Sequence, residues 1–261
     1  MRRDWAVIDA YCHCGISKYR PVEDVLGAIR KAGVERAVLC QHLGEYDNGY
    51  LAAIVDRYPG CFAAVCLIDS ASPDWRSELR QLHAAGSFAG LRVTADTLLE
   101  NFALPAEAVA LGLTLVVYSP EGIPRVLAPI RRLTAEQPDA TVVITHLGCP
   151  RVEDDRVATG WELIELAAQH RVFVTLSGQS MFCEYPYMAL DGLVAELIGS
   201  YGADRVMWGS NYPVCGSSRA YQRDLALITP GRWGLDRRGV RQITSETAER
   251  LWFARNDPSE P

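Results

Sequence analysis

The sequence has no run of basic residues, no long apolar stretch and only five histidines, so few positions are open to imidazole chemistry. Its formal net charge of −6 makes nucleic acid and anionic membrane surfaces poor partners. No apolar stretch approaches the ~18 residues that a membrane-spanning helix requires. The first residues, MRRDWAVIDA, lack the apolar segment and cleavage site of a secretory signal. We therefore expect a soluble, cytoplasmic protein that acts on a small molecule.

Disulfide bonds are not expected, although the chain has eight cysteines, because cytosolic thiols stay reduced. Cys40, Cys61 and Cys66 lie in or beside apolar runs, where cysteine behaves as a small hydrophobic residue. Cys12 and Cys14 flank His13, but one intervening residue is fewer than the about two to four that usually separate paired zinc-binding cysteines. In a continuous strand both thiols would also point away from His13. A cysteine-ligated metal is therefore not expected here.

Short apolar runs alternate with amphipathic segments along the whole chain. The predicted strands are nearly continuous apolar runs, as in parallel strands covered on both faces. They span Trp5–His13, Arg36–Gln41, Phe62–Asp69, Phe88–Val93, Leu113–Ser119, Thr141–His146, Val172–Ser177 and Val206–Asn211. Helices are predicted at Pro21–Gly33, Tyr50–Tyr58, Asp74–Ala85, Pro105–Leu111, Pro124–Glu136, Trp161–His170, Tyr187–Tyr201, Ala220–Ile228 and Arg237–Phe253.

Eight strands, each followed by a helical segment, predict an α/β fold, a single-domain (β/α)8 TIM barrel. No linker or low-complexity block divides the chain, so the barrel is expected over residues 1–255, with a polar C-terminal tail at 256–261. The alternative is a doubly wound open sheet, but the segment DAYCHCG after the first strand lacks a glycine-rich phosphate-binding fingerprint. Active sites of barrels lie at the C-terminal ends of the strands.

Side chains alternate along a strand, so the residues that face the barrel interior can be predicted. In the first strand we expect the inward side chains to be Asp9, Tyr11 and His13. The side chains that face the helices are expected to be Ile8, Ala10 and Cys12. The last inward residues of the other strands are predicted to be Gln41, Arg92, His146, Ser177 and Asn211. In the fifth strand either Tyr118 or Ser119 points inward. Polar residues at these positions are typical of an active site.

Each of these residues also has a structural interpretation. Gln41 and Ser177 can equally be loop anchors. Arg92 inside a barrel requires an anionic partner, either Asp9 or another internal carboxylate, or the carboxylate of a substrate held by two hydrogen bonds. We favour the substrate, with Gln41, Tyr118 and Ser177 as further contacts. The remaining histidines lie off this face or within helices and are predicted to be structural or surface residues; they are His42, His83 and His170.

Seven motifs follow one another along nearly the whole chain: VIDAYCH, AGVERAVLCQ, DNGYLAAIVDRYPGCFAAVCLID, AGLRV, VVITHLGCP, VFVTLSG and RVMWGSNYP. Together they resemble the amidohydrolase-related (amidohydrolase 2) family of the metal-dependent hydrolase superfamily. The resemblance is greatest to the branch of lactonases and dicarboxylate hydrolases. It implies a TIM barrel and a hydrolytic activity.

The resemblance also implies a set of site residues. The two histidines of the family's His-x-His pair fall on Tyr11 and His13, and its sixth-strand histidine falls on His146. The eighth-strand aspartate, which in the family ligates metal and activates water, falls on Asn211. The arginine of G-x-R, which holds the substrate's acid group in carboxylate-binding members, falls on Arg92.

Departures from this pattern weaken the metal site. If a divalent metal such as zinc were bound, its ligands would be His13, His146 and Asn211, a set without the negative charge that offsets a dication. The fifth strand ends in Tyr118-Ser119 without the metal histidine of some members, and the seventh-strand lysine is Thr175. We therefore expect no cofactor.

Asn211 cannot act as a base, because an amide does not titrate near neutrality. His13 and His146 are the remaining candidate bases, with Tyr11, Asn211 and Arg92 as donors to a carbonyl oxygen or carboxylate. We expect a metal-independent hydrolase of a small, anionic lactone- or ester-like ring. Loss of His146 should lower the rate ~10²-fold if it is the base. The alternatives are a decarboxylase, cyclase or other lyase acting on a small carboxylate, and a catalytically inactive barrel that binds a ligand.

The loop Gly178–Tyr187 is rich in aromatic residues. It is predicted to be a wall or lid over the substrate, or to pack on the barrel rim. The sequence leaves the oligomeric state open, a homo-oligomer included.

Overall fold

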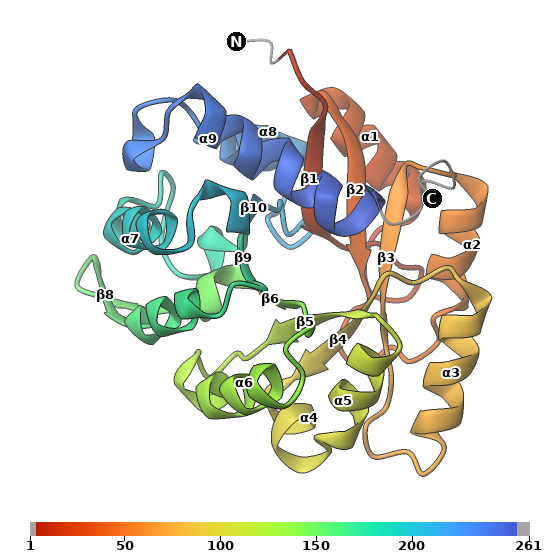
Figure 1. Cartoon of the computed structure of the whole chain (residues 1–261). Coiled ribbons are helices and arrows are strands. Elements are labelled where there is room, and N and C mark those ends of the chain that lie inside the picture. Colours follow the sequence, from red (N-terminus) through yellow and green to blue (C-terminus); the bar gives the residue numbers. More distant parts are fainter. Residues whose placement is uncertain (1–3, 255–261) are drawn as a thin grey trace.

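The computed structural model describes residues 4–254, and eight parallel strands form its main sheet (Figure 1). These strands are β1 (Val7–Cys12), β2 (Val34–Cys40), β3 (Phe62–Leu67), β4 (Gly90–Thr94), β5 (Thr114–Tyr118), β6 (Val142–Ile144), β9 (Val172–Leu176) and β10 (Val206–Trp208). They are hydrogen-bonded in sequence order. The predicted tail at 256–261 lies outside the described residues.

The last strand returns to the first. The Asn211 N–H donates to the Tyr11 carbonyl at 2.9 Å, and the His13 N–H donates to the Tyr212 carbonyl at 2.7 Å. Gly209 permits this approach, because a Cβ there would lie 2.7 Å from the Cβ of Tyr11. The sheet is therefore a nearly closed (β/α)8 TIM barrel, which confirms the predicted fold.

Helices surround the strands (Figure 1). They are α1 (Val22–Ala32), α2 (Gly49–Arg57), α3 (Trp75–Ala85), α4 (Ala95–Glu100), α5 (Ala103–Ala110), α6 (Pro124–Glu136), α7 (Asp191–Tyr201), α8 (Ser218–Ala226) and α9 (Arg237–Arg241). Two π-helical segments continue α9, Gln242–Glu246 and Glu249–Phe253, and a 3-10 helix covers Trp161–Ala168. Short 3-10 turns occupy His146–Gly148, Gln179–Met181, Met188–Leu190, Ala203–Arg205 and Arg232–Gly234.

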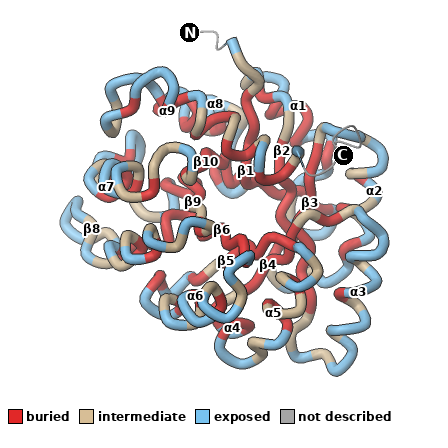
Figure 2. The backbone as a smooth tube through the Cα atoms, viewed as in Figure 1, coloured by how far each residue is buried: buried red, intermediate tan, exposed pale blue. Residues whose placement is uncertain are grey.

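The core has two layers, because each strand buries both of its faces (Figure 2). The outer layer packs strands against helices. The inner layer fills the barrel with side chains that include Ile8, Val65, Val116 and Met207, and Trp252 of the C-terminal segment packs with them. A filled interior leaves the strand ends as the place for a site.

Several predicted elements were wrong in detail. A hairpin, β7 (Arg151–Glu153) and β8 (Arg156–Thr159), follows β6 and was not predicted. It turns at Asp154 and Asp155, both with the positive φ that a two-residue hairpin turn needs. The helix α4 was also missed; the Thr94 hydroxyl caps it by accepting from the Thr97 N–H. The predicted helix at 161–170 is a 3-10 helix.

The predicted alternation in the first strand was wrong for its first half. Ile8 and Ala10 belong to the inner layer, and Asp9 points out of the barrel toward α8. The pairing of β1 with β2 is irregular between Asp9 and Cys12, so Tyr11 follows Ala10 on the inner side. One extra residue at a bulge reverses the alternation beyond it, which is why the pattern failed at Asp9 and held at Tyr11.

The predicted strand ends at His146 and Asn211 were also wrong. The strand β6 stops at Ile144 and β10 stops at Trp208, and both His146 and Asn211 have a left-handed φ of 54°. Histidine and asparagine are among the non-glycine residues that adopt this region most readily. All eight cysteines are free in this structure. Within the described residues, no helix combines the length and apolar character needed to cross a bilayer.

Candidate active site

Polar side chains gather where the strands end, and nearly all of them are buried. Tyr11 lies at the centre. Its ring meets the edge of the His13 ring at 5.0 Å between centroids and that of the His146 ring at 4.8 Å. The Tyr11 hydroxyl is buried without a hydrogen bond of good geometry, although the Cys40 thiol is close enough to affect its pKa. The structure thus brings Tyr11, His13 and His146 together.

His13 is held by the main chain of the next strand. Its Nδ1 lies 2.7 Å from the carbonyl oxygen of Cys40. A carbonyl can only accept, so Nδ1 carries the proton and Nε2 carries a lone pair when the ring is neutral. Burial, and then the Arg92 cation, lowers the pKa of His13 well below its usual value.

His146 is held by two hydroxyl groups from β9 and its end. Its Nδ1 lies 2.9 Å from Ser177 Oγ, and its backbone N–H donates to Thr175 Oγ1 at 3.2 Å. The two hydroxyls are 2.9 Å apart and fully buried. Burial, and then Arg92, lowers the pKa of His146 to about 3. Both site histidines are therefore neutral at physiological pH.

Arg92 is a buried cation with only neutral partners. It donates from Nη1 to the Gln41 carbonyl at 2.6 Å, and its guanidinium lies 5.1 Å from the ring centroid of Tyr118. Its Nε has no partner, and within residues 4–254 no carboxylate pairs with it. The less favoured alternative, in which Asp9 or another internal carboxylate pairs with Arg92, therefore does not hold for residues 4–254.

The structure places two other strand-end positions for which the sequence left alternatives open. Tyr118, rather than Ser119, faces the site: its ring meets His146 edge-on at 5.6 Å, while the Ser119 hydroxyl caps its own loop at Gly122. Gln41 is not the inward residue of β2, because Cys40 already takes that side. The Gln41 side chain bonds to the main chain of Asp47 and His42, so it anchors its loop.

Asn211 lies at the mouth beneath the loop Gly178–Tyr187. Its Nδ2 lies 3.4 Å from the sulfur of Met181, and it is buried while Met181 is partly exposed. The same loop lines an open hollow of about 610 Å³ on its outer side with Arg223. The loop thus covers Asn211 on one side and faces solvent on the other.

Asp9 plays no part in the mouth. Its carboxylate accepts from the Ser210 N–H and hydroxyl, from the Tyr221 hydroxyl and from the Tyr11 N–H. Burial raises its pKa to about 6 against these hydrogen bonds. Asp9 therefore joins β1, β10 and α8 from behind the site.

Sequence reasoning missed Tyr19 and His42. Tyr19 stacks on the His13 ring with 4.8 Å between centroids and 17° between planes, and its edge meets His42 at 5.2 Å. His42 was placed off this face, yet it is buried beside the mouth. The available signal was position alone, because both residues lie in loops that follow β1 and β2, and such loops form the mouth of a barrel.

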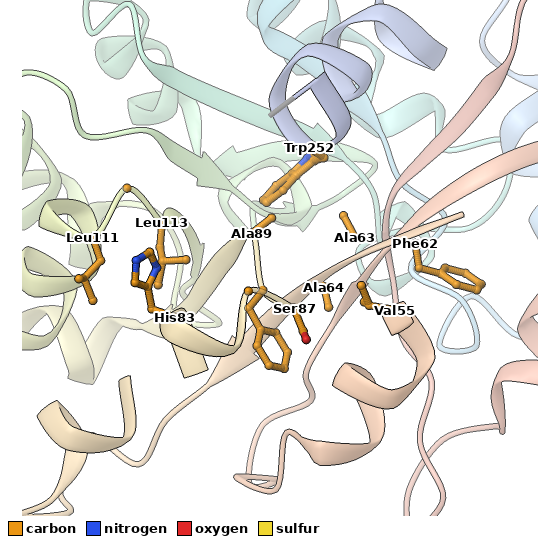
Figure 3. Close-up of a pocket in the computed structure, with 13 residues that line it drawn as sticks. Val55, Phe62, Ala63, Ala64, His83, Ser87, Ala89, Leu111, Leu113 and Trp252 are labelled. Atoms are coloured by element: carbon orange, nitrogen blue, oxygen red, sulfur yellow. The ribbon is translucent and has the colours of Figure 1, made fainter. Parts of the chain in front are cut away.

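A separate cavity of about 200 Å³ lies at the opposite end of the barrel (Figure 3). It is lined by residues at the N-terminal ends of strands and by Trp252, among them Phe62, Ala89 and Leu113. Active sites of TIM barrels lie at the C-terminal ends of the strands. This cavity is therefore separate from the histidine cluster.

Comparison of the sequence with models of known protein families gives a match over most of the barrel. The family model described as amidohydrolase matches residues 16–254, which is most of the chain. The chain belongs to the amidohydrolase family.

Individual amidohydrolase relatives differ in reaction. L-fucono-1,5-lactonase of Burkholderia ambifaria is 27% identical over 208 residues, which cover 74% of this chain and 69% of the relative. A Pseudomonas putida structure proposed to be a 2-pyrone-4,6-dicarboxylic acid hydrolase has a TM-score of 0.75 at 21% identity, covering 94% and 97% of the two chains. The 5-carboxyvanillate decarboxylase of Sphingomonas paucimobilis has a TM-score of 0.66 at 13% identity, covering 95% and 98%.

The metal that the amidohydrolase family implies does not fit the donor set of this chain. No group of three histidine, cysteine or acidic side chains suited to a metal occurs among residues 4–254. The nearest carboxylate behind the mouth, Asp9, is fully engaged elsewhere. The Arg92 cation also acts on both histidines. Two imidazoles and the amide of Asn211 are a poor set for a dication beside a guanidinium.

Proposed function

We propose that this amidohydrolase opens a small lactone- or ester-like ring that carries a carboxylate, using a histidine base and no metal. The observation that carries this proposal is Arg92, a buried cation with a free Nε and no carboxylate partner in residues 4–254. An unpaired buried charge is costly. A substrate carboxylate would supply the missing anion through two hydrogen bonds.

The neighbouring groups suit acyl chemistry. The Tyr11 hydroxyl is a buried donor without a hydrogen bond of good geometry, and it lies between two neutral imidazoles. A donor poised for a developing oxyanion and a neutral base for water are the two needs of ester hydrolysis. An activated ring needs less assistance than an amide, because its oxygen leaves readily. The lactonase and dicarboxylic acid hydrolase names of the relatives support the same substrate class.

Decarboxylation is the second candidate. It needs no attacking water, so the loss of a water-activating aspartate at Asn211 costs it little, and one structural neighbour is a decarboxylase. Labelled solvent separates the two reactions, because hydrolysis incorporates ¹⁸O from water into the product and decarboxylation releases carbon dioxide. Ligand binding without either signal would support the third alternative, an inactive barrel.

The test of the carboxylate site compares matched lactones with and without a ring carboxylate. We expect wild-type protein to prefer the carboxylate-bearing lactone, and Arg92→Gln to lower kcat/KM for it by ~10²-fold, the size of a lost charge-assisted pair. The neutral lactone should change little. Arg171→Gln is the matched control, since Arg171 also has a partnerless Nε but precedes β9 at the other end of the barrel. Equal rates on both lactones would contradict the proposal.

A further inference from the structure

We propose that His13 is the general base of this site and that Tyr19 positions its ring. This assignment rests on the proposed hydrolysis and chooses between the two site histidines. It depends on the hydrogen-bond partners of the rings and on the aromatic stack over the mouth.

The first step concerns the proton on each ring. His13 Nδ1 faces a carbonyl oxygen, that of Cys40, at 2.7 Å. Because a carbonyl cannot donate, the neutral ring must keep its lone pair on Nε2. His146 Nδ1 instead faces the Ser177 hydroxyl at 2.9 Å, a group that both donates and accepts. Only His13 therefore has a lone pair fixed by its partner.

The second step concerns ring orientation. The Cys40 carbonyl fixes one edge of His13, and the Tyr11 ring meets another at 5.0 Å between centroids. The flat face of His13 is covered by Tyr19 at 4.8 Å and 17°. Offset aromatic stacks at such separations stabilise one ring orientation beyond area burial. The ring of His13 thus has little freedom to rotate or tilt.

The third step concerns what holds Tyr19. Tyr19 is only half-buried, and it lies in a loop that the Gly15 N–H closes by donating to the Arg20 carbonyl at 2.9 Å. The His42 ring meets the edge of Tyr19 at 5.2 Å, and His42 itself is buried. His42, Tyr19 and His13 therefore form a continuous stack from the β2 loop to the base. This gives Tyr19 a positioning role through its ring rather than through its hydroxyl.

The reaction then balances as a simple hydrolysis. Nε2 of His13 takes one proton from water while the water oxygen bonds to the lactone carbonyl carbon. Collapse of the tetrahedral intermediate breaks the ring C–O bond, and the departing alkoxide takes the proton back from the His13 imidazolium. One water is added, and the base is regenerated.

The test of the base uses chemical rescue with the carboxylate-bearing lactone. His13→Ala should lower kcat by ~10²-fold or more, as expected for loss of a general base, and added imidazole should restore part of it. His146→Ala should not be rescued by imidazole. Rescue of His146→Ala alone, or a His13→Ala variant with near-wild-type kcat, would overturn the assignment.

The test of Tyr19 uses its two-step truncation. Tyr19→Phe keeps the ring and should retain near-wild-type kcat, whereas Tyr19→Ala should lower kcat by ~10-fold or more with little change in KM, because a misplaced base slows the chemical step. Tyr58→Ala is the control, since the Tyr58 ring packs against Phe62 and Arg57 at the N-terminal end of β3, away from the mouth. An equal loss in Tyr19→Phe and Tyr19→Ala would contradict stacking and point to the hydroxyl.

A readout independent of turnover separates this inference from the proposed function. Long-range ¹H–¹⁵N correlation spectra of the wild-type protein should show Nδ1 of His13 protonated and Nε2 unprotonated. Tyr19→Ala should broaden or shift those signals and Tyr19→Phe should not. If no lactone incorporates ¹⁸O, the proposed function fails whatever the spectra show. If ¹⁸O is incorporated but Nδ1 of His13 is unprotonated, the inference fails alone.

Discussion

At the residue scale the site is a cation enclosed by neutral groups. Arg92 contacts a carbonyl oxygen and the face of Tyr118, and the histidines nearby are both shifted toward their neutral forms. This arrangement keeps a base available and leaves the positive charge of Arg92 for a ligand. An internal carboxylate beside the Arg92 guanidinium would have cancelled that charge, and none lies there within residues 4–254.

The pH dependence follows from the lowered pKa values. A histidine with a lowered pKa stays unprotonated further into acid, and the pKa of His146 is about 3 while that of His13 is well below 6.5. We therefore expect kcat/KM to stay level as the pH falls through about 6.5, the region where an ordinary histidine base would become protonated and lose activity. A pH–rate profile of the carboxylate-bearing lactone measures this.

The same profile has an internal control. Arg92→Gln removes a cation that lowers both pKa values, so its acid limb should move to higher pH than that of the wild type. A wild-type limb centred near pH 6.5, unmoved by Arg92→Gln, would contradict this electrostatic description.

At the element scale, the seam of the barrel, where β10 returns to β1, depends on Asp9. Its carboxylate gathers donors from β1, from the end of β10 and from α8, next to the main-chain bonds that bring Tyr11 and Asn211 together. The seam therefore sets the spacing between the first and last strands. This is a structural role behind the site, although the residue lies two positions from Tyr11.

Removing this acceptor should destabilise the fold. Asp9→Ala leaves the Ser210 and Tyr221 donors buried without a partner, so the free energy of unfolding should fall by ~2–3 kcal/mol, against ~1 kcal/mol for Tyr221→Phe, which removes one donor only. Urea denaturation of the two variants measures both. A loss for Tyr221→Phe as large as that for Asp9→Ala would indicate that packing, not the carboxylate, holds the seam.

The carboxylate also has a pH signature. Burial raises the folded pKa of Asp9 to about 6, above an unfolded value of about 4, so the folded state binds the proton more tightly. The part of the stability that comes from this tighter proton binding is thus full below about pH 4 and is lost as pH rises through about 6. The unfolding free energy of wild type relative to Asp9→Asn should fall across that window.

At the scale of the whole molecule the two ends of the barrel differ. One end holds the histidine cluster. At the other end Trp252 packs into the barrel interior and lines a cavity whose walls are mainly apolar residues. Metal-dependent relatives would place their ion at the first of these ends. Among residues 4–254 that end holds the guanidinium of Arg92 and the amide of Asn211 and no free carboxylate, an arrangement that suits an anion better than a dication.

Metal dependence can be tested on the intact protein. We expect protein purified without added metal to contain far less than one equivalent of zinc or manganese, and a chelator to leave kcat/KM unchanged, because in the proposed mechanism a histidine rather than a metal-bound hydroxide activates water. Elemental analysis and a chelator titration measure this. One equivalent of metal whose removal abolishes turnover would contradict the metal-free proposal.

The sequence alone determined the eight-stranded barrel, since apolar runs and helical periods alternate regularly and each run must bury both faces. It also determined that His13, Arg92 and His146 lie at one end of the barrel, because each stands at or near the C-terminal end of an apolar run. It did not determine the orientation of Asp9, which an irregularity in β1 reverses, or the backbone of His146 and Asn211, which is left-handed.

Only the tertiary structure decided which groups contact one another. The Cys40 carbonyl fixes the proton of His13 from the neighbouring strand, and the Tyr19 ring stacks on His13 from a loop. Within residues 4–254 no strand or loop brings an acid to Arg92. Local sequence patterns report the face of an element and not its partner across space. The chemistry of this site depends on those partners, because they set which imidazole nitrogen is free and which charge is unpaired.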